Sequence, residues 1–112
     1  MITNFNTALG LRPGDAPGTV LLDPGPEHQV APDVVHFAVL TTLAEVSAAS
    51  VVGVPVVPAT VTVHLLSRAR LAPLEGRGRL LRAGKRLAVA EGEVFQDGAL
   101  VAKATVQFAV LG

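Results

Sequence analysis

Residues 34–52 read VVHFAVLTTLAEVSAASVV, the longest run in the chain without glycine or proline. Such a run predicts a helix of several turns, because nothing in it interrupts the backbone hydrogen bonds. Gly53 and Pro55 follow the run and end the helix. For its start, Asp33 is the best N-cap residue, and a later start near Phe37 is equally compatible with the sequence. We therefore expect one long helix at the centre of the fold.

The segments on either side of this helix have the pattern of β-strands. Apolar and polar residues alternate along them with a period of two. One helix packed on the concave face of an antiparallel sheet is an α+β design, and we expect the sheet to be curved around the helix. Residues 1–17 contain several glycines and prolines and are predicted to form a lead before a single domain over residues 18–112. The predicted strands cover residues 19–23, 60–70, 76–81, 86–95 and 99–110.

The hairpin between the last two strands can be drawn in two registers. A two-residue turn would set Glu91 opposite Ala104 on the apolar face. A three-residue loop over residues 96–98, with Gly98 left-handed, instead sets Glu91 opposite Lys103. We predict the second register, because it keeps charged and apolar side chains on separate faces. The inner face of the first strand then consists of small residues, which let the helix lie close: Ala88, Ala90, Gly92 and Val94.

The helix carries one carboxylate, Glu45, among alanine, valine and threonine residues. Partial burial there should raise its pKa towards the range in which it acts as a general base or nucleophile at neutral pH. The simpler interpretation is that Glu45 faces water. His36 lies nine positions earlier and so on the opposite side of the helix, at about 100° per residue. His36 and Glu45 therefore cannot form a dyad in one chain, and His36 can be a structural hydrogen-bonding residue.

Residues 36–45, HFAVLTTLAE, resemble the helix-opening motif of PaaI-type hot-dog acyl-CoA thioesterases. In that motif His-Gly-Gly is followed by four residues and then by Leu-Ala-Asp or Leu-Ala-Glu. Residues 84–89 and 97–105 also resemble the closing strands of this family. The resemblance spans about residues 26–111 and implies a hot-dog fold, in which a curved antiparallel sheet wraps one long central helix.

The resemblance also implies roles for particular residues. Glu45 matches the catalytic carboxylate, which attacks the thioester carbonyl or activates water for the attack. After His36, the backbone N–H of Phe37 or Ala38 at the helix N-terminus would polarise the thioester oxygen. Members of the family work as dimers whose site forms where one subunit's helix meets the other subunit, so we expect a homodimer or homotetramer. Two positions depart from the family: Phe37-Ala38 replaces Gly-Gly, and Val30 replaces an Asn six residues before the His.

The charges of the chain are unevenly distributed. Its net charge is zero, yet seven of its nine basic residues lie within residues 68–86, opposed only by Glu75. Such a stretch fits the phosphates of CoA, which guanidinium and ammonium groups bind well. The alternative is a charged outer sheet face in contact with water. The residues that we predict to bind CoA phosphates are Arg68, Arg82, Lys85 and Arg86.

Other classes of function find little support in the sequence. The chain has no cysteine, and its three histidines lack the spacing of metal ligands, so no metal or other cofactor is expected. Its four phenylalanines all lie outside the basic stretch, which argues against nucleic acid as a partner. No segment approaches the ~18 apolar residues of a membrane span, so we expect a soluble cytoplasmic protein.

Three functions compete. The first is an acyl-CoA thioesterase with Glu45 as its carboxylate. The second is a catalytically silent hot-dog protein that binds acyl-CoA or another partner, which Phe37 and Val30 favour. The third is a hot-dog hydratase or dehydratase. It is the least expected, because the paired His and carboxylate of such enzymes are not found at their usual spacing.

Overall fold

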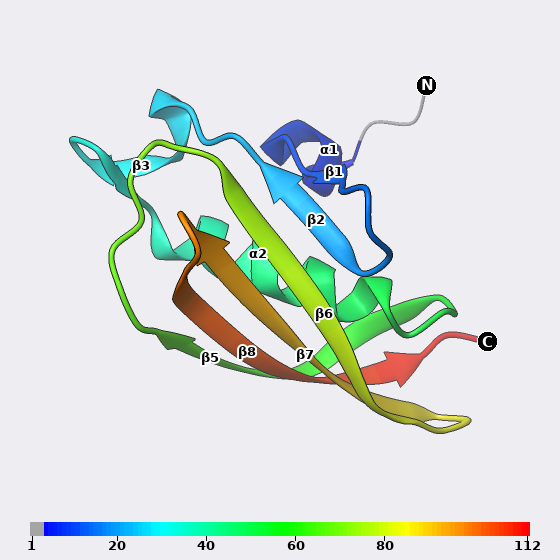
Figure 1. Cartoon of the computed structure of the whole chain (residues 1–112). Coiled ribbons are helices and arrows are strands. Elements are labelled where there is room, and N and C mark those ends of the chain that lie inside the picture. Colours follow the sequence, from blue (N-terminus) through cyan, green and yellow to red (C-terminus); the bar gives the residue numbers. More distant parts are fainter. Residues whose placement is uncertain (1–3) are drawn as a thin grey trace.

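The protein, described over residues 4–112 by a computed structural model, consists of one long helix, α2, on the concave side of a curved antiparallel sheet (Figure 1). Six strands form this sheet in the order β1-β2-β6-β7-β8-β5, and β3 pairs with β4 separately. The predicted α+β fold with one central helix is confirmed. The elements are α1 (Phe5–Leu9), β1 (Arg12–Pro13), β2 (Thr19–Leu22), η1 (Pro26–His28), β3 (Gln29–Ala31), β4 (Val34–Val35), α2 (Phe37–Ser50), β5 (Val56–Leu65), β6 (Leu74–Ala83), β7 (Leu87–Gln96) and β8 (Ala99–Val110).

Helix α2 begins at Phe37, so the start at Asp33 is wrong and the later start is confirmed. The two valines before the helix form β4 instead, and the Val35 N–H donates to the Ala69 carbonyl at 2.8 Å. Asp33 has a φ of 57° in the turn between β3 and β4. Its carboxylate accepts a hydrogen bond from the Leu71 N–H at 3.0 Å. Tertiary hydrogen bonds therefore hold this segment extended where its composition alone permits a helix.

The hairpin of β7 and β8 differs from both registers considered for it. Its turn has only two residues, 97–98, and both have positive φ, 51° and 77°. A β-bulge then leaves Val101 without a partner in β7, and beyond it Lys103 lies opposite Glu93 rather than Glu91. The predicted three-residue loop is therefore wrong. One extra residue is needed to keep the apolar side chains of β7 and β8 on the same face of the sheet. That residue lies in β8 and not in the loop, because a bulge adds one residue to one strand of a pair.

Small residues on the inner sheet face allow α2 to lie very close to it, as predicted. A Cβ atom at Gly92 would overlap the carbonyl oxygen of Ala44, and one at Gly78 would overlap the carbonyl oxygen of Ser47. The helix backbone thus rests almost directly on the sheet backbone. The predicted inner face of β7 is buried throughout, and the largest core side chains are Phe108, Leu22, Leu43, Leu74, Val94 and Val106.

Strand β5 is the last strand of the main sheet, and its outer edge has no partner among residues 4–112. It begins before Pro58 and ends at Leu65, whereas residues 60–70 were predicted to be the strand. Pro58 fits there because an edge strand tolerates a residue without an N–H. The other predicted strands correspond to β2, β6, β7 and β8, whose ends lie within two residues of the predicted bounds, whereas β1, β3 and β4 were not predicted. Several apolar side chains of β5 are exposed, namely Val57, Val61 and Leu65.

The N-terminal lead is folded onto the rest of the chain. Strand β1 pairs with β2, and the side chains of Leu9 and Leu11 pack against the hydrophobic core. Residues 1–3 of the predicted lead lie outside the described residues. A division between a lead at residues 1–17 and a domain at residues 18–112 stays a prediction.

Candidate functional site

Glu45 lies on the side of α2 that faces away from the sheet. The buried residues of the helix are Val39, Leu40, Leu43, Ala44, Ser47 and Ala48, and Glu45 does not share their face. Its carboxylate forms no hydrogen bond or ion pair with any of residues 4–112, and it is only partly exposed. Burial raises the pKa of the Glu45 carboxyl above its ordinary value of 4.5. A partly desolvated carboxylate without a cation beside it has the character that a general base or nucleophile needs.

The backbone N–H of Phe37 at the N-terminus of α2 has no acceptor among residues 4–112. His36 is the N-cap residue, and its Nδ1 accepts a hydrogen bond from the Ala38 N–H at 2.9 Å. The imidazole stacks on the Phe37 ring with centroids 4.7 Å apart. The His36 imidazole and the Ala38 N–H are thus already bonded to each other. Among residues 4–112 the Phe37 N–H has no acceptor, so it is the free one of the two predicted oxyanion donors.

One chain cannot bring its Glu45 and its Phe37 N–H to the same thioester. The two residues are eight positions apart in α2, which is about 12 Å along the helix axis at 1.5 Å per residue. The carboxylate acts at the carbonyl carbon and the N–H binds the carbonyl oxygen, and these two atoms are only about 1.2 Å apart. The structure therefore places both predicted groups on one helix but does not bring them together in one protomer.

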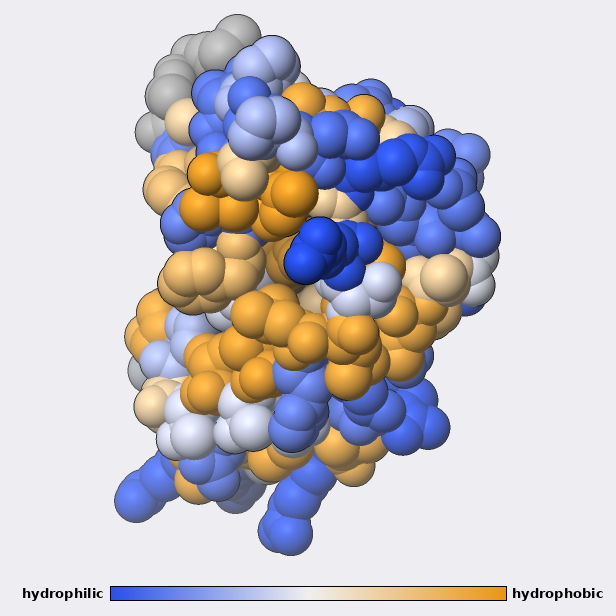
Figure 2. Space-filling view, turned by 90° about the vertical axis from the view of Figure 1, so that its left-hand side faces the viewer, coloured by the Kyte–Doolittle hydropathy of each residue, from blue (hydrophilic) through white to orange (hydrophobic). Residues whose placement is uncertain are grey.

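A hydrophobic hollow of about 440 Å³ lies beside the N-terminus of α2. Phe37 is 58% exposed and lines it, and Figure 2 shows hydrophobic surface gathered on this side of the molecule. Val30, at the position of the family's Asn, also lines the hollow and is exposed. The neighbouring Gln29 uses its side-chain oxygen to accept from the Asp33 N–H at 3.1 Å. Among the described residues, no amide side chain lines this hollow in place of the family's Asn.

The basic residues predicted to bind CoA fall into two groups. Arg82 and Arg86 line one cavity of about 370 Å³ at the hairpin between β6 and β7. Lys85 lies in the turn of the same hairpin. Arg68 lines the hollow beside Phe37, before the opposite end of β6. Since β6 has ten residues at about 3.3 Å each, the two groups are roughly 30 Å apart in one chain. None of the four forms an ion pair within residues 4–112.

Of the remaining arginines of the basic stretch, Arg70 lies in the loop before β6 and pairs with Asp97, while Arg77 and Arg79 lie on the outer face of β6. Arg79 donates to the Glu91 carboxylate at 2.6 Å, and Lys103 lies 3.4 Å from the same carboxylate. The Arg79 hydrogen bond is the main cause that lowers the pKa of Glu91, against a smaller effect of burial. Arg77 stacks over the Phe95 ring at 4.3 Å. Arg77 and Arg79 thus contribute to a charged outer sheet face.

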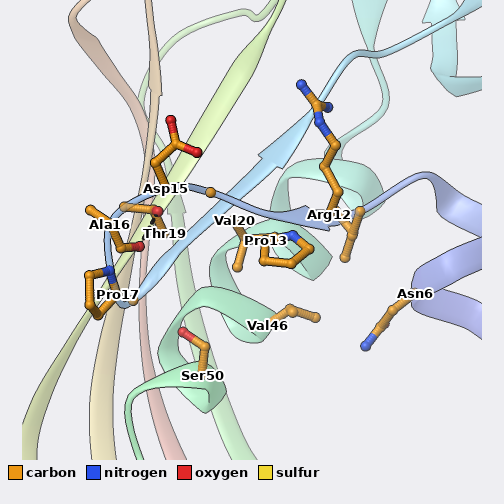
Figure 3. A pocket seen from close by; sticks show the side chains of 13 residues that line it. Asn6, Arg12, Pro13, Asp15, Ala16, Pro17, Thr19, Val20, Val46 and Ser50 are labelled. Atoms are coloured by element: carbon orange, nitrogen blue, oxygen red, sulfur yellow. Dashed lines mark hydrogen bonds between the residues drawn. The ribbon is translucent and has the colours of Figure 1, made fainter.

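A further cavity of about 450 Å³ lies between the lead and the second half of α2 (Figure 3). Residues 11–19 form its outer wall, and Val46 and Ser50 of α2 form its floor. For most of this part of the chain the sequence predicted only a lead with several glycines and prolines. The signal for this wall in the sequence is the spacing of prolines and glycines over residues 13–18, which fits a tight loop.

Within residues 4–112 no group of histidine, aspartate and glutamate side chains is arranged to hold a metal ion. Over the same residues no helix is long and apolar enough to cross a membrane.

Several solved structures are similar to this chain over almost its whole length. A conserved protein from Pseudomonas aeruginosa is 28% identical, with a TM-score of 0.85 over 99% of this chain and 96% of that chain. A mutant of the phenylacetic acid degradation protein PaaI from Thermus thermophilus is 26% identical, with a TM-score of 0.84 over 96% and 98%. A Bacillus halodurans protein, in a crystal structure with CoA, is 24% identical, with a TM-score of 0.88 over 99% and 78%.

The family comparison agrees with these structures, while no curated protein matches the sequence. Residues 26–109, which are 84 of the 112 residues, match the acyl-CoA thioesterase N-terminal domain. The hot-dog fold expected from the sequence is thereby confirmed. The chain belongs to the acyl-CoA thioesterase domain family.

Proposed function

We propose that this protein hydrolyses acyl-CoA thioesters and that Glu45 is the carboxylate that carries out the reaction. One observation supports this most strongly. Glu45 is the only ionisable side chain within α2, it is partly buried without a partner among residues 4–112, and its pKa is raised. A carboxylate that has no function is normally exposed to water or paired with a cation.

The chemistry needs no further reagent than water. The carboxylate either attacks the carbonyl carbon, forming an acyl anhydride that water then hydrolyses, or removes a proton from the attacking water. In both cases the C–S bond breaks, the CoA thiolate takes up a proton, and a free carboxylic acid is released. The negative charge on the carbonyl oxygen requires a hydrogen-bond donor, which is the role that we assign to the Phe37 N–H.

The site that we propose is shared between two protomers. Since Glu45 and the Phe37 N–H of one chain are about 12 Å apart along the helix, each thioester would use Glu45 of one protomer and the N–H of the partner's Phe37. Two antiparallel α2 helices related by a two-fold axis near Thr41 would place these groups together, since Thr41 lies midway between them. The outer face of α2 suits such a contact, because Ala38, Thr41 and Ala49 are small.

The edge of the main sheet supports the same assembly. Strand β5 has an unpaired outer edge within the described residues, and its exposed Val57, Val61 and Leu65 would be unusual at a free surface. We propose that two copies associate along this side, as a homodimer or as half of a homotetramer. Analytical ultracentrifugation tests this, and a monomer at micromolar concentration would contradict it.

We assign the CoA phosphates to the hairpin between β6 and β7. Arg82 and Arg86 share a cavity there, Lys85 lies in the same hairpin, and no carboxylate among residues 4–112 neutralises them. Arg68 is assigned a separate role beside the hollow at Phe37, because it lies at the other end of β6. We further propose that the protein works in the cytoplasm, which fractionation of cells would test.

The experiment that tests the proposed function measures thiol release from short, medium, long and aryl acyl-CoA substrates. We expect turnover by the wild type and a loss of about a thousandfold in Glu45→Ala and Glu45→Gln, with fold and oligomer unchanged. Glu93→Gln is the matched control, because it removes a carboxylate from the outer sheet face. Wild-type activity should also decline at acid pH with a midpoint above 4.5, because the raised pKa of Glu45 sets the fraction ionised. Equal activity of wild type and Glu45→Gln would contradict the proposal.

A silent acyl-CoA-binding protein is the second candidate. The observation that favours it is the hydrogen bond from the Ala38 N–H to His36, which leaves only one of the two predicted donors free. Binding of acyl-CoA by calorimetry without thiol release from any substrate would select this candidate.

A further inference from the structure

The cavity between the lead and α2 is separate from the groups discussed so far, and its walls are well defined. The Gly14 N–H donates to the Thr19 carbonyl at 2.9 Å, and the Thr19 N–H donates to the Ala16 carbonyl at 3.2 Å. The Gly78 N–H of β6 donates to the Gly18 carbonyl at 2.8 Å, which ties this loop to the sheet. The cavity therefore has an ordered outer wall that hydrogen bonds fix in place.

The lining of this cavity is apolar in its chemistry. Most polar groups in it already have partners within the chain: the Ser50 hydroxyl donates to the Ser47 carbonyl at 2.7 Å, and the Thr19 hydroxyl donates to the Ala16 carbonyl at 2.5 Å. The guanidinium of Arg12 lies 3.2 Å from the Asp23 carboxylate. Asn6 and Asp15 also line the cavity, and proline, valine, leucine and alanine side chains supply the other walls. Among residues 4–112 no aromatic ring lines it. These walls suit an aliphatic ligand and offer little to a polar or aromatic one.

The position of the cavity relates it to Glu45. Val46 and Ser50 form its floor on α2, so the cavity begins at the residue that follows Glu45 (Figure 3). The carboxylate itself lies on the adjacent face of the helix, about 100° around the axis from Val46. A thioester whose carbonyl meets Glu45 can thus direct its acyl chain over the helix and under the lead. At about 450 Å³ the cavity has the size of a small-molecule site.

We propose that this cavity binds the acyl chain of the substrate and that the preferred substrates are straight-chain aliphatic acyl-CoA esters longer than butyryl. This inference rests on the proposed thioesterase function and adds the substrate class to it. Each methylene buried in the cavity should lower KM by about fourfold until the cavity is full. Acyl groups with an aromatic ring should be poorer substrates, because no ring among residues 4–112 lines the cavity. Those with a terminal carboxylate should also be poorer, because Arg12 is paired with Asp23 and the Asp15 carboxylate lies in the wall.

The test is a chain-length series of acyl-CoA substrates with two variants that fill the cavity from opposite walls. Val46→Phe adds bulk from the helix, and Ala16→Phe adds bulk from the exposed loop, where folding is less at risk. For both we expect KM for decanoyl-CoA to rise at least about tenfold, while kcat/KM for butyryl-CoA changes less than about twofold. Val54→Phe makes the same change at an exposed position outside the cavity and should leave the series unchanged.

The outcomes separate this inference from the function on which it rests. If Glu45-dependent turnover is present but both filling variants keep the wild-type chain-length profile, the acyl cavity is wrong and the thioesterase function stands. If no substrate is turned over, the proposed function fails, and binding of the stable thioether decyl-CoA is measured instead. Weaker binding of decyl-CoA by both filling variants than by the wild type would still support the cavity, and equal binding would overturn it.

Discussion

The environment of Glu45 makes the folded protein less stable when its carboxyl is ionised. Burial raises the pKa of its carboxyl, so the folded state binds this proton more tightly than the unfolded state does. The folded protein therefore loses stability as the pH rises from the ordinary value of 4.5 through the raised pKa, and below 4.5 this loss is absent. Such a cost at a position that packing does not require is typical of a functional side chain.

This argument predicts the effect of replacing Glu45 by glutamine on stability. Glutamine has a similar shape and no charge, so Glu45→Gln should raise Tm by a few degrees at pH 7. The difference should vanish near pH 4, where both residues are neutral. Thermal unfolding followed by circular dichroism at the two pH values measures this. A lower Tm of Glu45→Gln at pH 7 would mean that the carboxylate stabilises the fold and has a structural partner.

Among the elements, the contact of α2 with β7 depends on a position without a side chain. A Cβ at Gly92 would overlap the Ala44 carbonyl oxygen, which is backbone and cannot rotate away. We expect Gly92→Ala to destabilise the protein by about 3 kcal/mol or more, because the helix must move off the sheet. Gly98→Ala is the control. It has open space around it, so only its positive φ should cost stability, about 1 kcal/mol. Urea unfolding distinguishes the two, and similar losses would contradict the close packing.

The hairpin between β6 and β7 leads to a prediction about substrate binding. If Arg82 and Arg86 bind the phosphates of CoA, alanine at either position should raise KM for an acyl-CoA by about tenfold. The same variants should leave KM unchanged for the corresponding acyl-pantetheine, which has no phosphate. Arg79→Ala is the control, because Arg79 pairs with Glu91 on the outer face. An equal rise of KM for both substrates would show that these arginines do not bind the phosphates.

The elements also show how far the sequence alone predicts the fold. Alternation along β7 and β8 predicts which residues face the helix, since one face must be apolar whatever the register. The register itself depends on a bulge at Val101, and no sequence pattern distinguishes a residue in the loop from one in the bulge. The start of α2 was ambiguous for a related reason. Residues near Asp33 are held extended by hydrogen bonds to a loop about 36 residues further along the chain.

At the level of the whole molecule, the sequence predicted that both candidate groups lie on one helix and that their site forms between two subunits, and in the structure α2 carries both groups about 12 Å apart. The spacing of His36 and Glu45 already excluded a dyad in one chain. The engagement of the Ala38 N–H by the His36 ring depends on a side-chain rotamer, which composition cannot predict. The cavity under the lead was missed, because its walls come from segments about 30 residues apart.

The central claim is that Glu45 of one protomer acts with the N–H of the partner's Phe37. Mixing two inactive variants tests this claim most directly. Phe37→Pro removes this N–H at a position where helices accept proline, and Phe37→Ala is the control that keeps the N–H. Glu45→Ala and Phe37→Pro should each be inactive alone. Unfolded and refolded together in equal amounts, they should recover about a quarter of wild-type thiol release, because half the dimers then contain one intact site. No recovery, in mixtures shown to contain mixed dimers, would contradict the shared site.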